Sequence, residues 1–109
     1  MNTGVEQWLY RLHPVRVEML TAGPTAREAE IVARHVDYLQ ALAEREVVFL
    51  AGRTLVDDAS TFGIVILLAA TRAAAQEIVD ADPAVGEGVM TAELFPFRVA
   101  IRSDAIAPC

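Results

Sequence analysis

Two apolar segments decide the fold of this chain: Val47-Val48-Phe49-Leu50-Ala51-Gly52 and Phe62-Gly63-Ile64-Val65-Ile66-Leu67-Leu68. Both runs are short and rich in β-branched and aromatic residues, which is typical of buried strands. The polar segment from Leu55 to Thr61 lies between them and predicts a hairpin loop. Because neither run alternates with polar residues, neither face of these strands is suited to contact with water.

An amphipathic helix is expected before this hairpin, over about residues 26–46. Thr25-Ala26-Arg27-Glu28 matches a capping box, in which a hydroxyl and a carboxylate bond backbone N–H groups reciprocally. Apolar residues then recur at helical spacing from Ile31 to Leu42, and charged residues occupy the other faces. A second helix is expected from Arg72 to Val79, with Thr71 as its cap.

Two further strands flank this central part. Trp8 to Leu12 alternates in the manner of a half-buried strand, and Pro14 ends it. Val15 to Gly23 is expected to be an irregular connector with a helical turn at Arg16–Leu20. The last strand is expected from Met90 to Ile101, bent near Phe95-Pro96-Phe97 because proline cannot donate to a central ladder.

The predicted order is βαββαβ in a single domain of residues 1–109. Right-handed crossovers would place both helices on one face of a four-stranded antiparallel sheet, which is the ferredoxin-like α+β arrangement. The other face would be left open, although its strands are too apolar for a solvated surface. We therefore expect a homodimer in which two sheets pack face to face, as in dimeric α/β-barrel proteins.

Composition excludes several classes of protein. The 109 residues carry 15 acidic side chains and nine basic ones, all arginines, for a net charge of −6. Without a basic stripe, we expect no nucleic-acid partner. The longest apolar run, Ile64 to Ala70, is far shorter than the roughly 20 residues that span a bilayer, and Met1 to Gln7 lacks a signal-peptide pattern. The single cysteine, Cys109, excludes an intrachain disulfide, so we expect a cytoplasmic protein with no membrane partner.

Two residues are candidates for proton transfer. His35 lies on the apolar stripe of the first helix, so it is either a core histidine bonded to a carbonyl or a general acid or base, for which its ordinary pKa of about 6.5 is suited. Asp82 lies where the second helix ends, because the residue before Pro83 is disfavoured in helical conformation. It is either a turn residue bonded to neighbouring amides or a carboxylate with a cationic partner such as His35.

The remaining candidates are arginines and loop acids. Arg53 follows Ala51-Gly52 and either holds an anionic oxygen in a pocket or points to solvent; Arg11 has a weaker case of the same kind. His13 follows the first strand, which indicates a surface position. Asp57-Asp58 is expected to be solvated loop, and no grouping at ligand spacing predicts a metal.

The sequence resembles the YciI-like (YCII-related) family. The likeness begins with the helix His35-Val36-Asp37-Tyr38-Leu39-Gln40-Ala41-Leu42 and continues through Val48-Phe49-Leu50-Ala51-Gly52 and Phe62-Gly63-Ile64-Val65. It ends with Ala81-Asp82-Pro83-Ala84-Val85, Gly88-Val89 and Glu93-Leu94-Phe95-Pro96-Phe97. The chain departs from the family at Arg53, where many members have proline, and in the connector Val15–Pro24, which is longer and could form part of the pocket rim.

The resemblance implies a ferredoxin-like fold that dimerises through its sheets, and an active site built on His35 and Asp82. It also implies elimination or rearrangement of a small cyclic or aromatic compound without a cofactor, by a lyase or isomerase. Cofactor-free oxygenation is a variant of this expected activity. We expect Arg53, Arg11 and Tyr10 to bind the substrate. The alternative is a non-catalytic module that binds a metabolite through the same pocket, or a purely structural domain.

Overall fold

The computed structural model describes residues 6–103, so the expectations for Met1 to Val5 and for Cys109 lie outside it. Along the chain its elements are β1 (Glu6–Pro14), α1 (Glu18–Thr21), α2 (Ala26–Glu44), β2 (Val48–Arg53), β3 (Gly63–Ala69), α3 (Arg72–Ala81), α4 (Pro83–Gly86) and β4 (Met90–Phe97). No helix in this part of the chain has the length and apolar character to cross a membrane.

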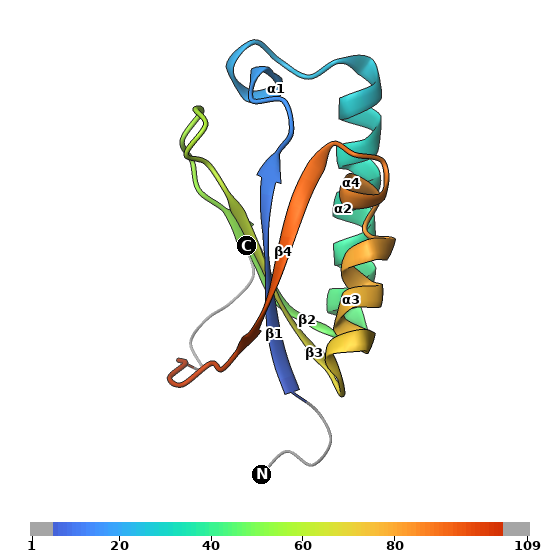
Figure 1. The fold of residues 1–109 in the computed structure, drawn as a ribbon, viewed down its shortest axis with the longest axis vertical. Coiled ribbons are helices and arrows are strands. Elements are labelled where there is room, and N and C mark those ends of the chain that lie inside the picture. The colour runs from blue at the N-terminus through green and yellow to red at the C-terminus, as the bar shows by residue number, and fades with distance from the viewer. Residues whose placement is uncertain (1–5, 104–109) are drawn as a thin grey trace.

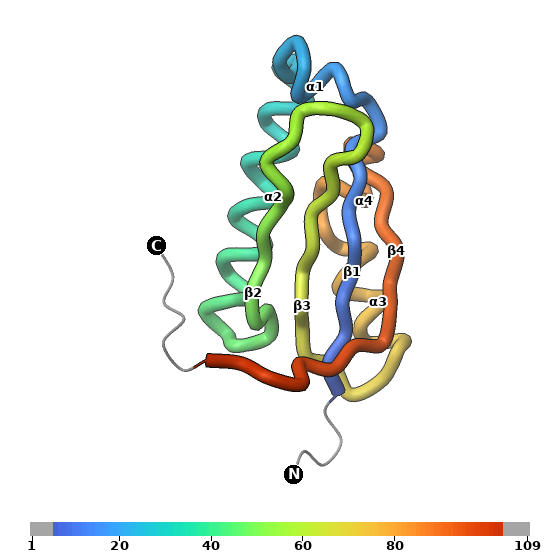
Figure 2. Tube along the Cα trace, turned by 90° about the vertical axis from the view of Figure 1, so that its left-hand side faces the viewer, coloured from blue at the N-terminus to red at the C-terminus, as the bar shows by residue number. Residues whose placement is uncertain are grey.

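The sheet has four antiparallel strands in the order β2-β3-β1-β4, which confirms the predicted α+β fold with its two β–α–β halves. β1 lies in the centre and pairs with β3 on one side and β4 on the other, so that Tyr10 is opposite Val65 and Leu94. Helices α2 and α3 both lie on one face of the sheet (Figure 1). From the other side the four strands lie in front and the helices behind them (Figure 2).

The core lies between the sheet and the helices. Along β1 the buried residues alternate with more exposed ones, so Trp8, Tyr10 and Leu12 face the helices. Val65 and Leu67 of β3 are 1% and 0% exposed. Burying an aliphatic side chain of this size contributes about 1.5–3 kcal/mol, so these central strands provide much of the stability of the domain.

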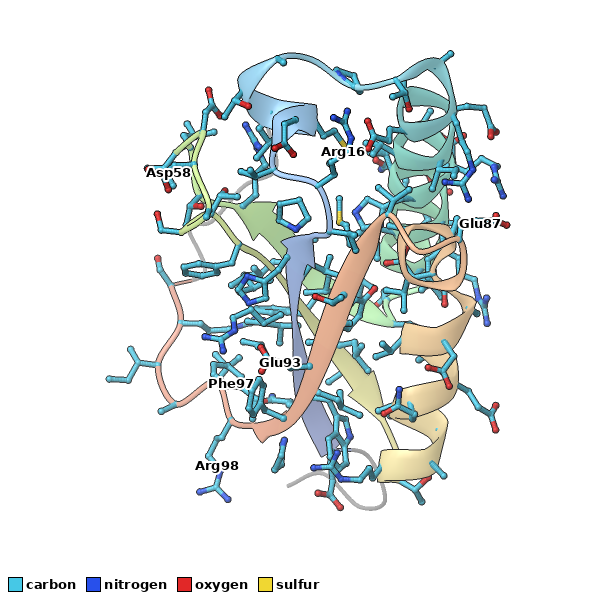
Figure 3. All side chains as sticks on the ribbon, turned by 45° about the horizontal axis from the view of Figure 1, so that its top comes forward. Arg16, Asp58, Glu87, Glu93, Phe97 and Arg98 are labelled. Carbon is cyan, nitrogen blue, oxygen red and sulfur yellow. The ribbon has the colours of Figure 1, made fainter. Side chains whose placement is uncertain are left out.

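Within residues 6–103 the opposite face of the sheet carries no helix. It includes Arg11 of β1 with Glu93, Phe95 and Phe97 of β4, and both phenylalanines are 41% exposed. Figure 3 shows Glu93 and Phe97 on the side of β4 that faces away from the helices. After β4 the chain crosses toward β2, where the guanidinium of Arg102 lies 5.7 Å from the ring centre of Phe49. The homodimer through this face stays a prediction.

The structure corrects the ends of several elements. β4 ends at Phe97 rather than Ile101, because its ladder with β1 reaches only the pair of Phe97 with Gln7, and the backbone N–H of Val99 donates to the Gln7 side chain instead. The second predicted helix, α3, ends at Ala81 as the position of Pro83 indicated, and Pro83 begins the short helix α4, which was not predicted. Proline fits the first helical position because that residue has no helical acceptor for an N–H group.

Candidate active site

His35 points into the interior because the residue at which α2 begins determines which side chains lie on its inner face. The predicted capping box is present: the Thr25 hydroxyl accepts from the Glu28 backbone N–H at 3.1 Å, and the Glu28 carboxylate accepts from the Thr25 N–H at 2.8 Å. From this start the inner face of the helix carries Glu28, Ile31, His35 and Leu42. His35 is 9% exposed, as expected for a residue on the apolar stripe.

Asp82 is fully buried at the junction of α3 and α4, and three donors surround its carboxylate. The Ala84 backbone N–H donates to Oδ1 at 3.0 Å, and the Tyr10 hydroxyl donates to Oδ2 at 2.8 Å. Nδ1 of His35 lies 2.7 Å from Oδ1 and 3.0 Å from Oδ2. Asp82 therefore caps a turn, as one interpretation predicted, and also bonds the imidazole, as the other did.

This arrangement decides where the protons of the pair lie. An ionised carboxylate only accepts hydrogen bonds, and the Tyr10 hydroxyl and the Ala84 N–H both donate to Asp82 in a site that water does not reach. We infer that Nδ1 of His35 carries a hydrogen and donates the third hydrogen bond to this carboxylate. In the neutral ring the lone pair remains on Nε2, which is the form required of a general base.

Nε2 of His35 has no hydrogen-bond partner among residues 6–103 and is not fully buried. Every fully buried side-chain nitrogen or oxygen among residues 6–103 has a hydrogen-bond partner. Since Nε2 has none, it is at least partly exposed. His35 lines a cavity of about 680 Å³ between α2 and the sheet. The free nitrogen is therefore accessible from this cavity, whose size suits a small-molecule ligand.

The cavity walls are mostly apolar. They comprise Leu12, Pro14, Met19, Leu20, Pro24, Ala29, Val32, Ala33, Val36, Leu39, Gly52, Phe62, Gly63, Ile64, Val65 and Met90, together with His35, Arg53 and Thr61. Met19 and Leu20 belong to α1, so the connector after β1 forms part of the wall. Arg53, at the end of β2, lines the cavity as the sequence analysis allowed, with 49% of its side chain exposed.

Tyr10 and Arg11 are placed differently from Arg53. Tyr10 is 0% exposed and does not line the cavity; its hydroxyl lies behind Asp82. Burial, followed by the charge of Asp82 and the hydrogen bond to it, raises the pKa of Tyr10, so this hydroxyl remains a donor. Arg11 lies on the open face of the sheet and bonds Glu93 at 2.9 and 3.1 Å. The structure thus brings Tyr10 to the pair through Asp82, and it does not bring Arg11 there.

His13 lies in β1 rather than after it. Its Nε2 is 3.5 Å from Glu93, on the same open face as Arg11, and its side chain is 37% exposed. The predicted surface position is therefore right, but the predicted loop position is wrong, because the strand extends to Pro14.

One ion pair, which joins the connector after β1 to α2, was not predicted from the sequence. The Arg16 guanidinium, in the connector, donates two hydrogen bonds of 2.8 Å to Glu28 of α2. Figure 3 shows Arg16 between the connector and this helix. The bonds from Arg16, with the backbone N–H of Thr25, lower the pKa of Glu28 to about 2. The sequence indicated only a helical turn at Arg16. The ion pair with Glu28 could not be predicted, because it depends on how the connector folds back on α2.

These features define a ferredoxin-like α+β domain with a buried histidine–aspartate pair at the wall of a cavity. The chain belongs to the YCII-related family, because the model of the YCII-related domain matches residues 14–98. The comparison with curated proteins found no match. The resemblance predicted from the helix around His35 and the motif around Asp82 is thereby confirmed.

Two solved structures are similar to this chain. One is the 5-chloro-2-hydroxyhydroquinone dehydrochlorinase TftG from Burkholderia phenoliruptrix in complex with 2,5-dihydroxybenzoquinone, which matches with a TM-score of 0.59 and 18% identity over 84% of this chain and 93% of that one. Another is a mutant of SnoaB, a cofactor-independent oxygenase from Streptomyces nogalater, with a TM-score of 0.49 and 10% identity over 92% of this chain and 97% of that one. At 18% identity the match to TftG supports the fold of this chain alone.

Proposed function

We propose that this protein is a small cofactor-independent enzyme in which His35 transfers a proton to or from a cyclic or aromatic substrate. One observation carries the proposal: Nδ1 of His35 is held by buried Asp82, while Nε2 is accessible from a mostly apolar cavity. A core histidine without a role would not require a buried carboxylate to orient it and an open space at its other nitrogen.

In the proposed reaction Nε2 removes a proton from the bound ring and becomes an imidazolium. Asp82 stabilises that charge through its hydrogen bond with Nδ1, because opposite charges 2.7 Å apart attract each other strongly in a buried site. The electron pair left on the substrate moves into the ring, and either expels a leaving group or is reprotonated at another atom by the same imidazolium. Arg53 stabilises negative charge on a substrate oxygen at the other wall.

The TftG structure suggests a first substrate to test. TftG is named as a dehydrochlorinase of 5-chloro-2-hydroxyhydroquinone, and dehydrochlorination removes a proton and chloride from the substrate. Such a ring is within the size range that a cavity of about 680 Å³ admits. We propose elimination from halogenated or hydroxylated rings of this kind as the activity of the present chain.

The test measures chloride release from 5-chloro-2-hydroxyhydroquinone by the wild-type protein and by His35→Gln and Asp82→Asn. We expect losses of at least about 100-fold, which is typical of a missing acid–base group. His13→Gln and Asp80→Asn are matched controls, because both side chains lie outside the cavity lining, and they should retain activity. Ligand binding without turnover in the wild type would favour the non-catalytic alternative, and full activity in His35→Gln would refute the proposed mechanism.

We further propose that two copies associate through their open sheet faces. Support comes from the exposed phenylalanines of β4 and from the absence of any helix on that side within residues 6–103. Burial of this face would remove apolar surface from water, which is the main favourable contribution to association.

A further inference from the structure

We propose that the substrate is an anion, a ring bearing a carboxylate or phenolate oxygen, and that Arg53 selects it by its charge. This inference rests on the proposed function, because it names the substrate class of the same cavity. It adds a binding preference that can be measured without turnover.

The first observation is the distribution of charge around the cavity. Among the described residues that line it, Arg53 is the sole permanently charged group, and no lining residue is acidic. The other polar lining residues are His35 and Thr61, and the Thr61 hydroxyl is already bonded to that of Thr54 at 2.9 Å. The cavity lining therefore carries one permanent positive charge and no negative one, in a chain whose net charge is −6. An anion is attracted to such a site and a cation is repelled from it.

The second observation is that the donors of Arg53 are available. Its guanidinium forms no hydrogen bond with residues 6–103, and its nearest carboxylate, Asp57, lies 4.0 Å away, beyond hydrogen-bond distance. By contrast, Arg11, Arg16 and Arg34 each donate from two nitrogens to a glutamate. Arg53 thus retains the planar pair of donors that a carboxylate or adjacent ring oxygens can accept.

The third observation is the position of Arg53 relative to the reacting group. Arg53 extends from the end of β2, whereas His35 extends from α2, so the two residues approach the cavity from different elements. Apolar side chains such as Leu39 and Val65 lie along the walls. A ring can contact these walls while its oxyanion binds Arg53 and its acidic proton faces Nε2 of His35. The ion pair of Arg53 with Asp57 is long, at 4.0 Å, so an anion bound to the guanidinium would replace only a weak contact.

The experiment compares benzoate with benzamide, which have the same ring and nearly the same shape but differ in charge. Each is titrated into the ¹⁵N-labelled protein, and affinities are taken from backbone chemical shifts. We expect the wild type to bind benzoate about tenfold more tightly than benzamide, the effect of one charge-assisted contact. Added salt should weaken benzoate binding alone.

Variants separate charge selection from general binding. Arg53→Gln should abolish the preference for benzoate and leave benzamide unchanged, whereas Arg98→Gln, an exposed arginine outside the cavity lining, should change neither. Equal affinities in the wild type, or a preference that survives Arg53→Gln, would overturn the inference. His35→Gln should retain benzoate binding. Failure of charge selection thus differs from failure of the proposed catalysis, which would appear as turnover that does not depend on His35.

Discussion

Replacing Tyr10 with phenylalanine would test whether Asp82 is an ionised group held by its donors. The substitution keeps the ring and removes one hydroxyl, whose hydrogen bond to Asp82 is 2.8 Å long. Both residues are 0% exposed, so water cannot replace the lost donor. A hydrogen bond to a charged group contributes about 1.5–3 kcal/mol, and we expect Tyr10→Phe to lower the free energy of unfolding by that amount. In a domain of this size the melting temperature would fall by roughly 10 °C.

The measurement is urea unfolding followed by the fluorescence of Trp8, the single tryptophan, which is buried in the core. Tyr38→Phe is the matched control: the Tyr38 hydroxyl donates at 2.6 Å to the backbone carbonyl of Ile78, a neutral acceptor. Its loss should cost only about 0.5–1.5 kcal/mol. If Tyr10→Phe proved no more destabilising than this control, an ionised Asp82 would be refuted, and with it the assignment of the Nδ1 proton of His35.

Three further predictions concern pH and assembly. The pKa of Tyr10 is raised in the folded state, so the stabilisation that its protonated hydroxyl gives the fold is complete below the ordinary tyrosine pKa of about 10 and is lost above it. The free energy of unfolding, measured from pH 8 to 11, should therefore fall in the wild type and fall less in Tyr10→Phe. The pKa of Glu28 is lowered from 4.5 to about 2 in the folded state, so the stabilisation by its ionised carboxylate is present above pH 4.5 and is lost as the pH falls toward 2. The free energy of unfolding of Glu28→Gln should therefore fall less over this pH range than that of the wild type. The same acid profile in both proteins would exclude the ion pair of Glu28 with Arg16. Sedimentation equilibrium should give a dimer that Phe95→Asp converts to monomer, whereas a monomeric wild type would contradict association through the open face.

Local rules explain why so much of the fold was predictable. The capping box at Thr25 sets the start of α2, and helical periodicity then places His35 on the inner face regardless of what lies beneath it. Alternation along β1 puts Arg11 and Tyr10 on opposite faces, because successive side chains of a strand point to opposite sides, so the prediction that both bind the substrate was wrong for Arg11. Element boundaries were less predictable: the end of β4 depends on where its partner β1 begins, which is not a property of the local sequence.

The roles of individual polar side chains depended on long-range contacts. Nothing near Asp82 in the chain indicates that Tyr10, 72 residues away, donates to it, so Tyr10 was expected at the substrate. Arg16 and Glu28 are only 12 residues apart, yet their pairing requires the connector to fold back on α2. Arg53 was expected either in a pocket or in solvent, and it lines the cavity while remaining half exposed.

The sequence alone determined the βαββαβ order of the four strands and two long helices, the family, and the inward position of His35, because backbone propensity and side-chain periodicity act over a few residues. Only the tertiary structure decided that Asp82, 47 residues further along the chain, bonds Nδ1 of His35, and that a cavity adjoins Nε2. Those two facts arise from how α2, α3 and the sheet pack together. A buried carboxylate is stable only where packing brings donors to it, and the chain supplies these donors from three separate segments.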